Sequence, residues 1–335
     1  MPSFRSGVVT AILSERTGLQ RVEVDGEKAY VLTQLVGPVT VGDRVVMNTT
    51  AVERGLGTGG WHVVHWNLAR ESWSQTGPGH IMKLRYTSLQ VDTGAAEELS
   101  SFPPATGLAG KPVVVCGLHS QVACVAAAFK HEAPERRLTY VMTDGGALPL
   151  AFSDLVADLR ALSLLDATVT CGHAFGGDYE AVNVHSALEV AGAMTGADAV
   201  VVAMGPGVVG TGTRTGTTAM EAATAIDAAG ALGGAPVAAV RYSDADARER
   251  HRGVSHHTVT ALGYAHSRAR VALPVGAPAA EVGEHEIVEV DVPDMTALLA
   301  SHGLTVTTMG RGPDEDPGFF RYAGAAGVVA ARLLG

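Results

Sequence analysis

Along the part of the chain that follows Lys111, short and almost wholly apolar segments alternate with segments of helical pattern. Pro112–Cys116, Leu138–Met142 and Ala199–Ala203 lack the regular alternation of polar and apolar residues that a half-exposed strand shows. Strands that are apolar along their whole length are buried on both faces, which is typical of a parallel sheet covered by helices. The sequence therefore predicts an α/β fold here, a doubly wound domain built on a mostly parallel sheet.

The starts of several helices are marked by capping residues. Ser153 and Asn183 stand directly before helical patterns, where a side-chain oxygen accepts a hydrogen bond from a free backbone N–H. Thr218 and Glu221 have the spacing of a capping box. We expect helices to begin at these three positions.

Residues 4–68 follow a different pattern, because strand-like segments succeed one another there without a convincing helix. The segments are Gly7–Ser14, Leu19–Val24, Ala29–Leu35, Arg44–Thr49 and Trp61–Trp66. Asp25-Gly26 is a strong hairpin signal, since glycine adopts the positive φ that such a turn needs. Five short strands favour a small closed barrel. We therefore expect a β-barrel-like domain over residues 1–70, a connecting segment over 71–110, and an α/β domain carrying the site over 111–335.

Composition narrows the classes of protein that the chain can belong to. Hydrophobic residues make up 47% of the 335 residues and charged residues 17%, which allows a large core and excludes a disordered chain. Acidic residues outnumber basic ones by 34 to 24, so we expect neither a nucleic-acid partner nor a membrane partner. The irregularly spaced Cys116, Cys124 and Cys171 favour a reducing, cytoplasmic environment. Ala/Gly-rich helices such as Ala219–Ala231 are compatible with a homodimer.

Nearly every residue type that supports binding or catalysis follows one of the predicted strands. In open α/β sheets, ligands bind beyond the carboxyl ends of the strands, which in a parallel sheet all lie at one edge. The loops at these positions are rich in Gly, Thr, His, Arg and Asp, whereas the opposite ends of the strands have no comparable concentration of such residues. We therefore expect one cleft in which His173, Arg241 and His256 or His257 surround the glycines of residues 205–216.

The segment Gly205–Gly210 matches the pattern G-x-G-x-x-G after a strand, but its surroundings do not match a dinucleotide site. The following helix starts too late, and the next strand ends in Arg241 rather than in an acidic ribose ligand. A P-loop is excluded because no lysine lies near these glycines. Backbone N–H groups and hydroxyls before a helix favour a small phosphate or carboxylate ligand, and the alternative is a turn capped by threonines. The predicted ligand-binding residues are Gly205, Gly207, Gly210, Thr211, Gly212, Thr213, Arg214, Thr215, Gly216, Thr217, Arg241 and Arg252.

Histidines and aspartates in the same loops are the candidates for acid/base chemistry. The tandem His256-His257 precedes an apolar helix, so at least one imidazole is expected to turn inward. A neutral imidazole can act as a general base or bind a metal, and a charged one can hold an anion. No spacing here matches a known zinc motif, so no metal ligand and no cofactor is assigned. The candidate catalytic residues are His173, Asp178, Asp144, His251, His256 and His257.

Four longer motifs stand at these loops. They are residues 173–183 (HAFGGDYEAVN), 204–213 (MGPGVVGTGT), 248–258 (RERHRGVSHHT) and 309–312 (MGRG). Together they resemble an uncharacterised bacterial family, the domain of unknown function 3866. The resemblance covers nearly the whole chain and implies no activity, because the family has none assigned.

Residues 199–258 and 308–322 are also similar to the alpha/beta precursor of clostridial glycine/sarcosine/betaine reductase component B. Those precursors are cleaved to form a pyruvoyl group, so the similarity implies amine-handling carbonyl chemistry. Thr170-Cys171 is the only dipeptide comparable to such a cleavage site, and Gly172-His173 give it no further support. We therefore expect an uncut chain with a buried thiol at Cys171.

Two functions are compatible with these patterns. The first is an enzyme that acts on a small anionic metabolite, in which the glycine-rich loop and an arginine hold the anion and an imidazole transfers protons. In this reading Asp144 or Asp178 orients the imidazole. The second is a non-catalytic protein that senses the same kind of ligand and reports its presence to a partner.

Overall fold

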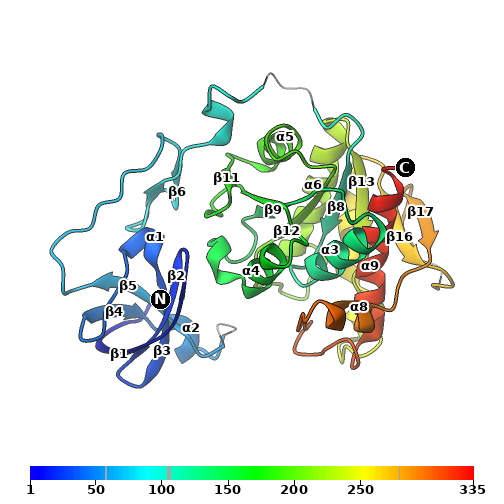
Figure 1. Ribbon diagram of the computed structural model, residues 1–335. Coiled ribbons are helices and arrows are strands. Elements are labelled where there is room, and N and C mark those ends of the chain that lie inside the picture. The colour runs from blue at the N-terminus through cyan, green and yellow to red at the C-terminus, as the bar shows by residue number, and fades with distance from the viewer. Residues whose placement is uncertain (57–58, 104–106, 279) are drawn as a thin grey trace. The chain divides into compact units, whose positions relative to one another are not determined.

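The computed structural model describes residues 1–56, 59–103, 107–278 and 280–335, and it divides into two compact units, Met1–Gly94 and Ala95–Gly335 (Figure 1). We call the first the barrel unit and the second the α/β unit. The predicted boundaries at residues 70 and 110 stay predictions, and residues 104–106 of the predicted connecting segment lie outside the described residues. Among the residues described, no helix is both long enough and apolar enough to cross a membrane.

The barrel unit contains a closed barrel with the strand order β1-β2-β3-β5-β4. The strands are β1 (Phe4–Arg16), β2 (Leu19–Val24), β3 (Glu27–Leu32), β4 (Arg44–Asn48) and β5 (His62–Asn67), with the short helices α1 (Thr33–Val36) and α2 (Thr50–Glu53) between them. Alternate apolar residues such as Val22, Val31 and Val45 fill its interior. A separate two-stranded sheet, β6 (Met82–Lys83) and β7 (Val91–Asp92), follows the barrel. The predicted small closed barrel is confirmed.

The α/β unit is built on an eight-stranded sheet in which neighbouring strands are parallel. The strand order is β11-β10-β9-β12-β8-β13-β16-β17. The bounds are β8 (Pro112–Cys116), β9 (Leu138–Thr143), β10 (Ala167–Thr170), β11 (Tyr179–Glu180), β12 (Ala199–Met204), β13 (Ala235–Ala239), β16 (Arg270–Pro274) and β17 (Glu286–Val290).

Helices cover both faces of this sheet (Figure 1). One layer contains α3 (Gln121–Glu132), α4 (Asp154–Ala161), α8 (Met295–Ser301) and α9 (Pro317–Arg332), and the other contains α5 (Val184–Met194), α6 (Glu221–Ala231) and α7 (His256–Tyr264). Along β8, Val114 and Cys116 pack into the first core while Val113 and Val115 pack into the second. Burial of successive residues on opposite faces explains why the strand is apolar throughout, and it confirms the doubly wound α/β fold.

Capping residues start two of these helices as the sequence predicts. Ser153 accepts a hydrogen bond from the backbone N–H of Val156 at the start of α4. Asn183 forms a capping box with Ser186 at the start of α5. The 3₁₀ helices are η1 (Ala96–Glu98), η2 (Leu150–Phe152), η3 (Thr218–Met220) and η4 (Glu249–His251).

Close packing of α9 against α3 depends on a glycine. A Cβ atom at Gly327 would lie 2.3 Å from the backbone oxygen of Val125 and 2.9 Å from the backbone nitrogen of Phe129. Both contacts are with main chain of the neighbouring helix, so no side-chain rotation can relieve them. The two helices approach this closely because position 327 has no side chain.

We expect Gly327→Ala to lower the free energy of unfolding by about 1–3 kcal/mol, because the added methyl group forces α9 away from α3. Urea denaturation measures this change. The matched control is Gly263→Ala on the exposed face of α7, where the nearest atom to a new Cβ is 3.9 Å away. There the better helix propensity of alanine should raise stability by up to about 1 kcal/mol. Equal effects of the two substitutions would contradict this role of Gly327.

Candidate functional site

The loop after β13 folds back so that both of its ends meet. Strands β14 (Tyr242–Ser243) and β15 (Gly253–Val254) pair antiparallel, which returns the chain to Arg241. The backbone N–H of Ser255 then donates to the carbonyl of Arg241 at 2.8 Å, and the hydroxyl of Ser255 accepts from the N–H of His257 at 3.3 Å. Arg241 therefore lies beside the first turn of α7.

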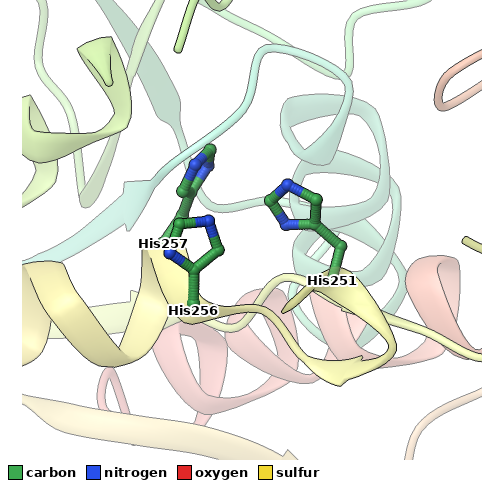
Figure 2. Close-up of side chains that lie close together, drawn as sticks. All are labelled: His251, His256 and His257. Atoms are coloured by element: carbon green, nitrogen blue, oxygen red, sulfur yellow. The ribbon is translucent and has the colours of Figure 1, made fainter. Parts of the chain in front are cut away.

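Three imidazole rings gather at this point, from η4 and from the first turn of α7 (Figure 2). The ring centroids of His251, His256 and His257 lie 4.3 to 4.9 Å apart. Nδ1 of His251 is 2.7 Å from the hydroxyl of Ser255, and Nδ1 of His257 is 3.3 Å from Nη1 of Arg241. We call Arg241, His251, His256 and His257 the histidine–arginine centre.

The imidazoles of the centre are held in their uncharged form. Burial, followed by the charge of Arg241, lowers the pKa of His251 to about 3. Burial and the neighbouring His256 lower the pKa of His257 to about 4, and burial also lowers the pKa of His256. Since the ordinary pKa of histidine is about 6.5, all three rings are neutral at pH 7. Neutral imidazoles can accept a proton or bind a metal ion.

Positive charge predominates around the centre. The carboxylate of Asp246 is shared by Arg248 at 2.8 Å, Arg241 at 3.5 Å and Arg311 at 3.8 Å. The side chain of Asp246 is only 4% exposed, and the hydrogen bonds and charge of Arg248 hold its pKa well below the usual range. Burial, with Arg248 nearby, lowers the pKa of Arg241 to about 10, so this guanidinium still keeps its charge at pH 7. Arg311 also pairs with Asp316 at 3.1 Å, so the three guanidinium groups face two carboxylates and leave one positive charge in surplus.

The network around Asp246 contains residues that were not predicted from the sequence as part of the site. Arg311 also binds the buried Asp316 at 3.1 Å, and the hydroxyl of Ser243 donates to the same carboxylate at 2.6 Å. Asp246 and Arg311 were not predicted as site residues. The available signal was their placement, because Arg311 lies in the motif at residues 309–312 and Asp246 precedes the motif at residues 248–258. Two motifs far apart in the sequence thus meet at one carboxylate.

The glycine-rich loop forms an exposed hairpin next to the centre. Thr211, Thr213 and Gly216 bond to one another within the loop, so part of its hydroxyl supply is used internally. The guanidinium of Arg250 lies beside it, 3.7 Å from the position of a Cβ at Gly212. Arg214 stacks over the ring of Tyr264 on α7 at 5.6 Å. The remaining predicted ligand-binding residues in this region are placed as follows: Gly205 is buried, Gly207, Gly210 and Thr215 are exposed, Thr217 caps η3, and Arg252 is exposed.

Close backbone packing requires a glycine at position 205. A Cβ there would lie 2.2 Å from the carbonyl oxygen of Ala147, so the backbone of the neighbouring loop leaves no room for a side chain. The first glycine of the G-x-G-x-x-G pattern therefore serves backbone packing.

The other predicted acid/base residues form a second group, beyond β9 and β10. Oδ2 of Asp144 accepts the backbone N–H of His173 at 2.8 Å. Asp178 accepts from the N–H of Thr168 at 2.8 Å and pairs with Arg160 at 3.1 Å. Both carboxylates thus support the main chain, Asp144 at His173 and Asp178 at the β10 turn, and their predicted role in orienting an imidazole stays a prediction.

A cavity of about 280 Å³ lies beside Asp144, lined also by Glu221, Cys171 and Asn183. Glu221 accepts a hydrogen bond from the hydroxyl of Thr143 at 2.5 Å, and burial raises the pKa of its carboxyl group. The predicted capping box of Thr218 and Glu221 is therefore wrong, because Glu221 turns to the sheet instead. The thiol of Cys171 is buried and faces the carbonyl of Met142 at 3.7 Å.

The strand order separates the two groups. His173 follows β10 and Arg241 follows β13, and β9, β12 and β8 lie between these strands. At about 4.8 Å between neighbouring strands, the two strand ends are roughly 19 Å apart. The expected single cleft containing both His173 and Arg241 is thus corrected to two groups. Sequence established that the loops share an edge, but not how many strands stand between them.

His119, which the sequence did not assign, occupies the junction of the loops after β8 and β12. Its Nε2 lies 2.7 Å from the hydroxyl of Ser153, and its Nδ1 lies 3.2 Å from the carbonyl oxygen of Met204. Burial lowers its pKa to about 4. The ring borders a cavity of about 310 Å³, shared with Pro206 and Gly207 of the glycine-rich loop.

Comparison with known protein families identifies the family of this chain. The family model described as "Protein of unknown function (DUF3866)" matches residues 28–327. The chain belongs to this family. The DUF3866 match includes the whole histidine–arginine centre, Asp246 and Arg311. No curated protein matches the chain, and the similarity to reductase component B stays a prediction.

For this DUF3866 protein we expect stability to fall as the pH drops from 6.5 toward 4. The pKa of His119 is lower in the folded chain than in the unfolded one, so in this range the unfolded chain binds more protons. His119→Gln should therefore flatten the pH dependence of the free energy of unfolding, while other histidines with lowered pKa retain the rest. Urea denaturation at several pH values measures the slope, with the exposed His266→Gln as control. An unchanged slope in His119→Gln would contradict the assignment.

Proposed function

We propose that the α/β unit binds a small phosphate- or carboxylate-bearing anion at the histidine–arginine centre. The observation that carries this proposal is the surplus of guanidinium groups over the carboxylates of Asp246 and Asp316. Arg250 adds to it, because it is exposed, lies near His256 and His257, and forms no salt bridge within the described part of the chain. A bound anion supplies the negative charge that this cluster of arginines lacks.

The local backbone supports the same ligand. Helix α7 begins at His256, and the partial positive charge of a helix N-terminus favours an anion beside it. The glycine-rich hairpin lies next to Arg250. Planar guanidinium groups bind phosphate and carboxylate with two parallel hydrogen bonds, which gives geometric selectivity as well as affinity.

The histidines give the anion site a group that can transfer protons. A neutral imidazole next to a bound anion can take up a proton released from it, and the arginines that lower the histidine pKa values keep this base available. An enzyme and a ligand sensor share the binding step and differ in turnover alone. We place the enzyme first, because a binding protein needs the arginines but has no need of three clustered imidazoles.

We expect Arg250→Ala to weaken binding of inorganic phosphate or succinate about tenfold or more, because a charge-assisted hydrogen bond contributes roughly 1.5–3 kcal/mol. Isothermal titration calorimetry measures the affinities. The substitution should change the free energy of unfolding by no more than about 0.5 kcal/mol, because the side chain is exposed.

The matched control is Arg268→Ala, which removes an exposed arginine of equal charge outside the centre. It should leave the affinity for both probes unchanged. Failure of the unaltered chain to bind either probe would refute the proposal. Equal weakening by both substitutions would show that the effect is one of net charge rather than of a site.

A further inference from the structure

The three histidines of the centre present nitrogen atoms at a spacing suited to a metal ion. One ring nitrogen from each of His251, His256 and His257 can be chosen so that all three lie within 4.8 Å of one another. Tetrahedral Zn²⁺, with Zn–N bonds of about 2.0–2.1 Å, holds its nitrogen ligands roughly 3.3–3.4 Å apart. Small rotations of the imidazoles close that difference. Figure 2 shows the rings of His256 and His257 on one side and that of His251 facing them.

One of these nitrogens lacks a partner, which a bound metal ion would supply. Nε2 of His256 is buried and has no hydrogen-bond partner among the described residues. A buried polar atom without a partner is rare and destabilising in folded proteins. The hydroxyl of Ser255 fixes Nδ1 of His251, which orients this ring and leaves its Nε2 for coordination.

We propose that His251, His256 and His257 bind one divalent transition-metal ion of the Zn²⁺ type, and that the anion of the proposed function completes its coordination. The inference rests on the proposed function in this respect, because an ion without an anion would add two positive charges beside Arg241, Arg248 and Arg250. An anion that touches both the metal and the guanidinium groups balances these charges.

Arg241 links binding of the anion to binding of the metal ion. A guanidinium only donates hydrogen bonds, so its contact with Nδ1 of His257 uses the lone pair of that nitrogen. An anion that draws Arg241 toward itself frees the lone pair for the metal.

The test is titration of the chelator-treated full chain with Co²⁺, whose visible absorption reports coordination by protein nitrogens. We expect one equivalent to bind, and we expect added inorganic phosphate to change the spectrum because it enters the coordination shell. His256→Ala should abolish binding at one equivalent. The exposed His266→Ala, just beyond α7, is the control and should bind as the unaltered chain does.

His256→Cys separates coordination from a purely structural role. A thiolate in place of the imidazole keeps a metal ligand and adds a sulfur-to-Co²⁺ charge-transfer band in the near ultraviolet. Appearance of that band with one equivalent of Co²⁺ supports the assignment even if His256→Ala fails to fold. Absence of the band in folded His256→Cys, or no binding of Co²⁺ by the unaltered chain, overturns it.

The outcomes keep the two proposals apart. Phosphate binding to the metal-free chain that depends on Arg250, without any Co²⁺ binding, upholds the proposed function and overturns the metal centre. Co²⁺ binding through His256 that phosphate neither strengthens nor alters upholds the metal ligands and overturns the anion as their partner. Failure of both titrations overturns both proposals.

Discussion

Burial of the central strands on both faces is the constraint from which the arrangement of the α/β unit follows. Val113 and Val115 pack on one side of β8 while Val114 and Cys116 pack on the other, and β12 repeats the pattern. A strand enclosed in this way has no position for a charged group that lacks a buried partner. Polar chemistry is therefore confined to the loops, and in a parallel sheet the loops that follow the strands gather at one edge.

Within that edge, the carboxylate of Asp246 organises the most strongly charged region. It binds Arg241, Arg248 and Arg311, which come from three separate parts of the loops. Burying a charge costs free energy because the charge loses its hydration. The attraction between the carboxylate and the guanidinium groups offsets this cost only where the geometry is good. Because these three guanidinium groups face only Asp246 and Asp316, the cluster keeps a net positive charge.

The same arginines determine what the neighbouring histidines can do. Their positive field and the burial of the rings keep His251 and His257 uncharged at neutral pH. An uncharged imidazole has a lone pair for a proton or a metal ion, whereas an imidazolium would only add to the repulsion. Anion binding and imidazole chemistry are thus linked by charge, because the arginines that attract an anion also lower the pKa of the neighbouring histidines.

The sequence by itself determined the elements of this protein and the edge on which its chemistry lies. Period and composition predicted the closed barrel and the doubly wound sheet, and Ser153 and Asn183 marked helix starts correctly, because these are local properties of a few residues. Tertiary structure alone decided which loops meet. Strand order places β9, β12 and β8 between His173 and Arg241, turns Glu221 to Thr143, and brings Arg311 to Asp246. The physical reason is that strand order depends on how each crossover helix packs against the whole sheet. No short stretch of sequence determines that packing.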